Sequence, residues 1–249
     1  MNDDDAQLLS QVRSLREKGS GPKQIARALG LKPARASALV RQVAHEQQST
    51  ATPTERPVVG CWINAGWSTD LELSAAPDWA RADDEGAGNP EAAGFAQVLI
   101  ARQERASRVT VCGFLVDVYC LGVKDTVGPE VRGGGSLDAY VRDYYRAFDQ
   151  PPLRIGLEQA QSIVHGGVAY ARTLGFEPAP DFAQAAVHLG EPGPAAPRIG
   201  FGRQGKPFYI NGPRDDAQKI VRTLERTCGA GNYHYVVGTG PCDQRPRRT

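Results

Sequence analysis

Apolar residues recur at helical spacing through the first 46 residues of the chain. Leu8, Val12 and Leu15 fall on one face of a first helix, which glycines at positions 19 and 21 bring to an end. A second helix starts with Pro22, and a third starts near Pro33. The pattern predicts a three-helix unit over residues 6–46. The inward positions of its second and third helices are Ile25, Ala26, Leu29, Ala36, Leu39, Val40 and Val43.

The rest of the chain mixes strand and helix patterns. A polar, proline-containing stretch without period, residues 47–57, predicts a linker. Strands arranged in groups, rather than in alternation with helices, indicate the α+β class. We therefore expect one α+β domain over residues 58–238, with a mixed, mostly antiparallel sheet and packed helices, followed by a disordered tail at 239–249.

Individual elements of this domain follow from its local patterns. Residues 70–93 are rich in Ala, Asp, Glu, Gly and Pro, which predicts a long insertion. Asp215 is expected to cap a helix that ends at Cys228. The other expected elements are strands at 58–65, 96–102 and 108–121, helices at 137–148, 156–174 and 181–189, a hairpin of 198–202 with 207–211, and a last strand at 233–237.

Composition narrows the class of protein. The formal net charge is +1, so a general polyanion binder is excluded and any nucleic-acid contact has to come from a local patch. Five cysteines without a C-x-x-C pair argue against a zinc ribbon and a disulfide framework. The chain has no signal peptide pattern and no apolar run near 18 residues, which predicts a cytoplasmic protein without a membrane partner.

A local basic patch does lie in the three-helix unit. No acidic residue occurs between Glu17 and Glu46. Phosphates attract such a patch, and the release of counterions supplies much of the affinity. The basic residues of this stretch are Lys18, Lys23, Arg27, Lys32, Arg35 and Arg41.

Residues 22–41 resemble the helix-turn-helix of resolvase-like and related bacterial DNA-binding proteins. Ile25 and Ala26 match the first helix of the motif, the turn matches Leu29-Gly30-Leu31, and Ala36 with Val40 takes inward places of the recognition helix. The resemblance implies that the start of the third helix faces the major groove of double-stranded DNA. Lys32, Arg35 and Ser37 are then the residues expected in the groove, and Lys23, Arg27 and Arg41 those expected at phosphates.

Two departures from the motif leave an alternative open. Lys32 occupies the N-cap of the recognition helix, where Ser or Thr is favoured, and Pro33 and Ala34 stand where polar base-reading residues are common. Sequence readout is then weak, or the unit binds a protein through a solvated basic face.

A second candidate site lies in the large domain. Asp117 is the one carboxylate in the apolar run 111–121, and burial without a partner is costly. Lys124 and Asp125 follow it closely, and His165 precedes two glycines inside a helical pattern, which indicates close packing or a bound group. Together these four residues form a hypothetical hydrolytic or metal-assisted site. The alternative is a buried Asp117–Lys124 ion pair and a hydrogen-bonded His165. No metal-ligand spacing occurs, so no metal is assigned and the cofactor is unknown.

Segments 114–125, 165–176, 206–213 and 232–238 are similar to parts of uncharacterised prokaryotic proteins, a resemblance that implies no activity. The sequence thus predicts a DNA-binding regulator, expected as a homodimer, whose large domain senses a small-molecule or protein ligand or mediates assembly. The alternatives are a hydrolytic enzyme that uses the helix-turn-helix as a targeting arm, and a non-catalytic protein-interaction adaptor.

Overall fold

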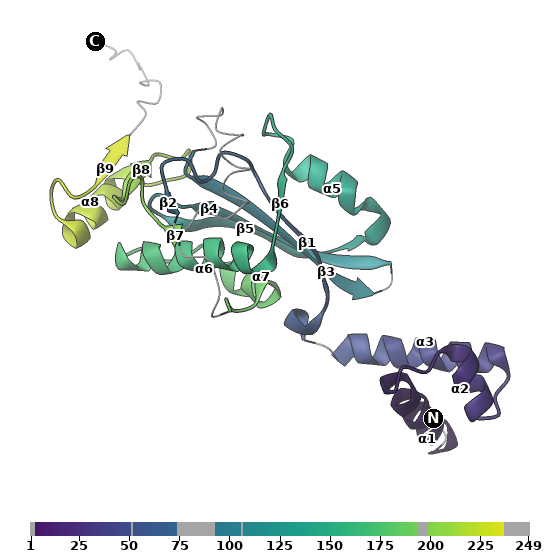
Figure 1. Ribbon diagram of the computed structural model, residues 1–249. Helices are drawn as coiled ribbons and strands as arrows, with labels where there is room; N and C mark the ends of the chain where they lie inside the picture. Colours follow the sequence, from purple (N-terminus) through teal and green to yellow (C-terminus); the bar gives the residue numbers. More distant parts are fainter. Residues whose placement is uncertain (1–2, 51, 74–92, 106, 194–198, 237–249) are drawn as a thin grey trace, which may run out of the picture.

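The structure is a computed structural model that describes residues 3–50, 52–73, 93–105, 107–193 and 199–236. The N-terminal unit consists of α1 (Asp3–Glu17), α2 (Pro22–Ala28) and α3 (Pro33–Thr50), which Figure 1 shows at one end of the molecule, apart from the sheet. The three predicted helices are therefore confirmed. Their shared core consists of Leu9, Val12, Ile25, Ala26, Ala36, Leu39 and Val43.

The helix α3 continues past the expected end of the unit. It runs to Thr50, so residues 47–50, which we expected to be linker, are helical. The sequence there holds no helix breaker before Pro53, and Gln47 and Gln48 are good helix formers. Polarity alone therefore did not mark the end of this helix.

The segment that follows α3 is bound to the large domain rather than free. Residues Pro53–Glu55 form a short 3-10 helix, η1. The buried Arg102 donates hydrogen bonds from Nη1 to the carbonyls of Thr54 (3.0 Å) and Arg56 (2.7 Å). The same side chain also donates to the carbonyls of His188 and Leu189 at the end of another helix. Part of the predicted linker, at Thr54 and Arg56, is therefore held by hydrogen bonds to the large domain.

The large domain is built on a five-stranded antiparallel sheet, which confirms the α+β class. Its strand order is β5-β4-β3-β1-β6. The strands are β1 (Val58–Ile63), β3 (Phe95–Arg105), β4 (Arg108–Asp117), β5 (Gly122–Gly133) and β6 (Leu153–Ile155).

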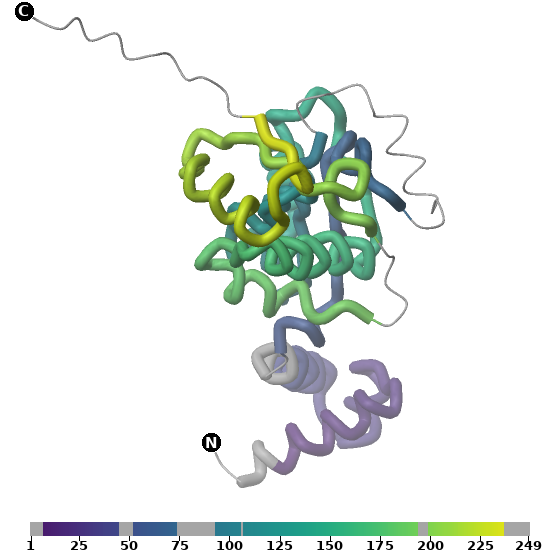
Figure 2. Tube along the Cα trace, turned by 90° about the vertical axis from the view of Figure 1, so that its left-hand side faces the viewer, coloured from purple at the N-terminus to yellow at the C-terminus, as the bar shows by residue number. Residues whose placement is uncertain are grey.

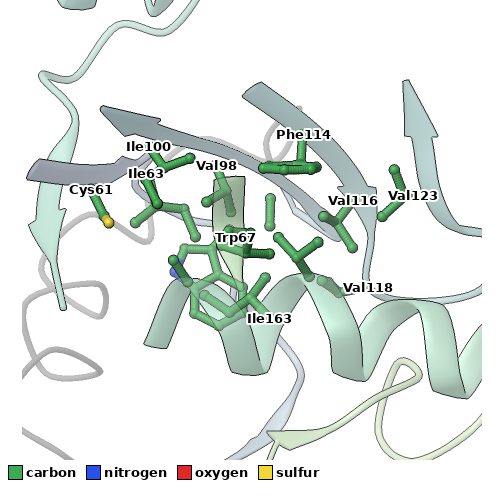
Figure 3. Close-up of a cluster of buried hydrophobic side chains, with 14 of the residues drawn as sticks. Cys61, Ile63, Trp67, Val98, Ile100, Phe114, Val116, Val118, Val123 and Ile163 are labelled. Atoms are coloured by element: carbon green, nitrogen blue, oxygen red, sulfur yellow. The ribbon is translucent and has the colours of Figure 1, made fainter. Parts of the chain in front are cut away.

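Helices cover both faces of this sheet (Figure 1). On one face, α6 (Leu157–Thr173) and α7 (Phe182–Leu189) close the main core. Figure 3 shows Trp67 and Ile163 of that core against side chains of the strands. On the other face, η2 (Gly134–Ser136) leads into α5 (Leu137–Tyr144), whose Leu137 and Val141 pack on Leu99 and Val111. Side chains of the central strands therefore point alternately to the two faces of the sheet and pack into two separate cores.

The expected strand 108–121 is in fact a shorter strand followed by a turn, and a further strand that was not predicted begins after it. β4 ends at Asp117, and β5 starts at Gly122, whose φ of +65° suits the left-handed region that glycine tolerates. β5 was missed because it is an edge strand. It alternates half-buried and exposed residues, with polar side chains and Pro129 among them, and so lacks an apolar run.

The predicted hairpin of residues 198–202 with 207–211 is also wrong. β7 (Ile199–Gly200) pairs antiparallel with β2 (Glu72–Leu73), and β8 (Phe208–Ile210) pairs parallel with β9 (His234–Val236). Both strands thus pair with other parts of the sequence, and the turn signals at 203–206 produce only a single antiparallel bridge between Arg203 and Lys206. The last predicted strand, by contrast, is confirmed as β9.

Helix α8 (Ala217–Cys228) starts one residue later than expected. Asp216, not Asp215, is its N-cap and accepts a hydrogen bond from the amide of Lys219 at 3.0 Å. Most of the predicted insertion (residues 74–92), part of the loop at 190–197 and the tail 239–249 lie outside the described residues. Of the helices that are described, none is both long and apolar enough to cross a membrane.

Candidate functional site

The basic residues of the N-terminal unit lie on its surface. Lys23 and Arg27 of α2 are exposed and line a shallow hollow together with Gln24 and Ala28. The turn into α3 is tight, because Gly30 adopts a φ of +64° and the amide of Leu31 donates to the carbonyl of Ala26 at 2.8 Å.

The side chains predicted on α3 and just before it are also accessible. Lys32, Arg35 and Arg41 are exposed, and Ser37 is half-buried. Arg41 Nε donates to the carbonyl of Ser37 at 3.2 Å, so this guanidinium lies back along the helix. Five of the six predicted contact residues are thus exposed basic side chains of α2, α3 and the turn between them, and the helices that carry them share a packed apolar core.

Asp117 is buried where β4 ends, at 2% exposure. Its Oδ1 accepts hydrogen bonds from the amides of Tyr119 (3.0 Å) and Cys120 (2.9 Å), which closes the turn between β4 and β5. Burial raises the pKa of Asp117 to about 6, although the charge of Lys124 and the turn amides oppose that shift. Among the described residues, Oδ2 has no hydrogen-bond partner.

Lys124 does not form the predicted contact ion pair with Asp117. Its Nζ lies 2.7 Å from Oδ2 of Asp215, a residue that the sequence did not single out for this role. Oδ2 of Asp215 also accepts hydrogen bonds from the amide of Gly212 (2.8 Å) and the hydroxyl of Tyr209 (3.3 Å). Burial by itself raises the pKa of Asp215, but these hydrogen bonds outweigh it and hold the pKa below its usual value.

His165 and Asp125 have partners elsewhere. Nε2 of His165 lies 2.8 Å from the carbonyl oxygen of Gly190, and its ring contacts Phe182 edge-on. Asp125 is exposed on β5, 3.6 Å from Arg214. The four residues of the hypothetical site are thus held by separate partners. Within the described ranges, no group of three or more His, Cys, Asp or Glu residues is arranged to hold a metal ion.

The two glycines after His165 are explained by close packing. A Cβ on Gly167 would lie 2.6 Å from Cγ1 of Val116, and one on Gly166 would lie 2.6 Å from the ring of Phe201. Helix α6 therefore approaches the sheet as closely as its backbone allows, which accounts for residues that are unfavourable in a helix. Cys120 is fully buried, as expected for a small apolar side chain.

Segments 114–125, 165–176, 206–213 and 232–236 meet at one end of the large domain. The amide of Phe208 donates to the carbonyl of Tyr119 (3.1 Å), and the amide of His234 donates to that of Pro207 (2.9 Å). Segments 114–125, 206–213 and 232–236 are thereby joined, and α6 packs on them through Leu174. They share a buried cluster of Cys120, Leu121, Leu174, Tyr209 and Leu224.

Comparisons with known proteins add no family to this description. No protein-family model matches the chain, and searches of curated proteins and of solved structures found no match either. The function has to be inferred from the residues of this chain and their arrangement.

Proposed function

We propose that the chain is a DNA-binding regulatory protein, in which α1–α3 bind double-stranded DNA and the large domain senses a ligand or mediates assembly. One observation carries the proposal. The surface of α2 and α3 exposes Lys23, Arg27, Lys32, Arg35 and Arg41 in a stretch that contains no acidic residue from position 18 to position 45.

The chemistry of this surface favours DNA over other partners. Each phosphate that a cation neutralises releases counterions, so a local excess of cations binds a duplex even though the whole chain carries only +1. The bases are read by side chains near the start of the recognition helix, where Lys32 and Arg35 stand. Phosphate contacts fall to Lys23, Arg27 and Arg41.

A single helix-turn-helix presents a small contact surface, so regulators of this kind act as dimers on two half-sites about 34 Å apart. We therefore expect the large domain to hold two copies together on DNA. A cytoplasmic location is part of the same proposal, because the target is the genome of a cell without a nucleus.

The test is fluorescence anisotropy of the full chain on random duplex DNA over a series of salt concentrations. The variant Arg35→Ala/Arg41→Ala removes two exposed charges from α3, whereas the control Lys219→Ala/Arg226→Ala removes two exposed charges from α8. We expect the first variant to bind more weakly and its salt dependence to fall by about one unit of slope for each lost phosphate contact. The control should bind like the wild type.

Two outcomes oppose the proposal. If the wild type does not bind DNA at low salt, the basic surface is a protein-binding face and the adaptor alternative takes its place. If both double variants lose the same affinity, the attraction is not localised on α2 and α3.

A further inference from the structure

A basic hollow lies at the end of the large domain remote from the N-terminal unit. Figures 1 and 2 place β8 and β9 opposite α1–α3. The volume of the hollow is about 310 Å³, within the range of pockets that take small molecules. Its lining residues are Arg203, Gln204, Lys206, Phe208 and His234.

The charges around this hollow favour an anion. Arg203, Lys206 and His234 are all exposed. Two carboxylates lie nearby: Asp70 pairs with Nε of Arg203 at 2.8 Å, and Oε1 of Glu72 lies 3.4 Å from the position of a Cβ built on Gly205. In the part of the chain that the structure describes, Lys206 has no carboxylate within 4.0 Å. Its ammonium group therefore has no ion-pair partner among those described residues.

The loop that carries these residues is held in an unfavourable conformation. Asp70 and Gln204 are the two described non-glycine residues with positive φ, at +60° and +51°. They contact each other, because the amide of Gln204 donates to the carbonyl of Asp70 at 2.8 Å. Such backbone conformations are unfavourable for residues other than glycine and persist where the surroundings impose them.

The loop conformation is held by the turn between β4 and β5, which Asp117 caps. The amide of Gly202 donates to the carbonyl of Val118 at 3.0 Å, and β8 is fixed to the same turn through Tyr119. A bridge between Arg203 and Lys206 closes the loop, so both basic residues stand on one rim of the hollow. The basic rim of the hollow is therefore preformed in the absence of a ligand.

Phe208 gives the hollow one apolar wall. The guanidinium of Arg203 lies over its ring at 4.9 Å, and Tyr119 meets the ring edge-on. Arg203 is thus oriented by both an ion pair and an aromatic contact. A ligand that suits these walls combines a strong anion with a planar organic part.

We propose that this hollow binds a small phosphate monoester that carries a planar organic group. Lys206 and the terminal nitrogens of Arg203 hold the phosphate, His234 adds a hydrogen bond, and the organic part lies against Phe208. The inference names the ligand class for the ligand-sensing part of the function proposed above. Its test contains no DNA, so the two proposals can fail separately.

Isothermal titration calorimetry of the full chain tests the idea with three probes: adenosine monophosphate, inorganic phosphate and adenosine. We expect adenosine monophosphate to bind more tightly than phosphate, and adenosine to bind weakest. Lys206→Gln removes one charge-assisted hydrogen bond. It should lower the affinity for adenosine monophosphate about ten-fold or more. Lys219→Gln, an equivalent change at an exposed lysine of α8, should leave its affinity unchanged.

Each other result overturns a defined part of the proposal. The proposed site is contradicted if none of the three probes binds. It is also contradicted if Lys206→Gln binds adenosine monophosphate as tightly as the wild type does. If phosphate and adenosine monophosphate bind with equal affinity, the hollow does not recognise the planar group. If adenosine binds as tightly as its monophosphate, the hollow does not recognise the phosphate.

Discussion

Nζ of Lys124 and Oδ2 of Asp215 lie 2.7 Å apart although 91 residues separate them in the chain. Their side chains are only 16% and 12% exposed, so solvent screens the pair weakly. The contact joins the edge strand β5 to the loop before α8. It therefore fastens the C-terminal elements to the sheet.

Removal of this ion pair should loosen that attachment. We expect Lys124→Met and Asp215→Asn each to lower the free energy of unfolding of the large domain, because each leaves a largely buried group without its charged partner. In a double-mutant cycle measured by urea unfolding, the two changes should couple by about 1–3 kcal/mol. Additive effects would show that the contact contributes nothing.

Asp117 should make stability depend on pH. Its pKa of about 6 in the folded chain exceeds the ordinary value of 3.8, so the folded state binds the proton more tightly than the unfolded state does. Its favourable contribution is therefore complete below the ordinary pKa and is lost as pH rises through about 6.

The variant Asp117→Asn keeps an oxygen that can cap the turn but cannot titrate. We expect the stability of the wild type, relative to this variant, to fall between about pH 4 and about pH 7 and then to level off. Urea unfolding of both proteins across that range measures the difference. A constant difference would mean that the carboxyl group stays ionised in the folded chain.

Because α6 lies so close to the sheet, we expect alanine at position 167 to destabilise the protein, although helix propensity alone predicts that it stabilises the helix. Alanine in place of glycine normally stabilises a helix by about 1 kcal/mol. In Gly167→Ala the new Cβ would meet Val116 in the core, so we expect a loss of about 1–3 kcal/mol in thermal or chemical unfolding.

Gly166→Ala is the matched control. Its Cβ would meet the far end of the half-buried Phe201 side chain, which can turn aside. We expect it to stay within about 1 kcal/mol of the wild type. If Gly167→Ala proves as stable as Gly166→Ala, close packing against Val116 does not explain the glycine at position 167.

The turn between α2 and α3 should require glycine for its backbone rather than for space. Nothing lies within 4 Å of a Cβ built on Gly30, whose φ is +64°. We expect Gly30→Ala to destabilise the three-helix unit by about 1–2 kcal/mol, and Gly30→Asn to do so by less, because Asn tolerates this region. Thermal unfolding followed by circular dichroism measures both.

A comparison with Gly21→Ala controls for the loss of glycine itself. Gly21 has an ordinary φ of −78°, and its nearest neighbour is a side-chain atom of Gln24 at 3.8 Å. Because Gly21 is the N-cap of α2, where alanine is less favourable than glycine, that variant should lose some stability but less than Gly30→Ala. Equal losses at both positions would contradict the account of the turn.

The sequence predicted those parts of the fold that depend on local periodicity. The three N-terminal helices, α6 and α7 all have apolar positions at helical spacing, and the chain order of the elements indicated the α+β class. The pairings of β2 with β7 and of β8 with β9 could not be predicted, because each depends on contacts between distant segments. Turn signals at 203–206 favoured the nearer partner.

The same limit applies to the candidate site in the large domain. Burial of Asp117 followed from the apolar strand around it, but its donors are amides of the next turn, which no side-chain pattern reveals. Proximity in sequence favoured Lys124 as its partner, whereas the bulge in β5 and the loop before α8 bring Lys124 to Asp215. The basic hollow escaped prediction because the mistaken hairpin separated His234 from Arg203 and Lys206.

The hydrogen bonds from Arg102 to the carbonyls of Thr54 and Arg56 limit the reach of the three-helix unit for which we propose DNA binding. Only three residues separate the end of α3 at Thr50 from the anchored Thr54, a span of at most about 14 Å when fully extended. A tether this short cannot adapt to half-sites at variable spacing. If two copies bind one operator, the distance between its half-sites is set by how the large domains meet, and operators with inserted base pairs should be rejected rather than accommodated.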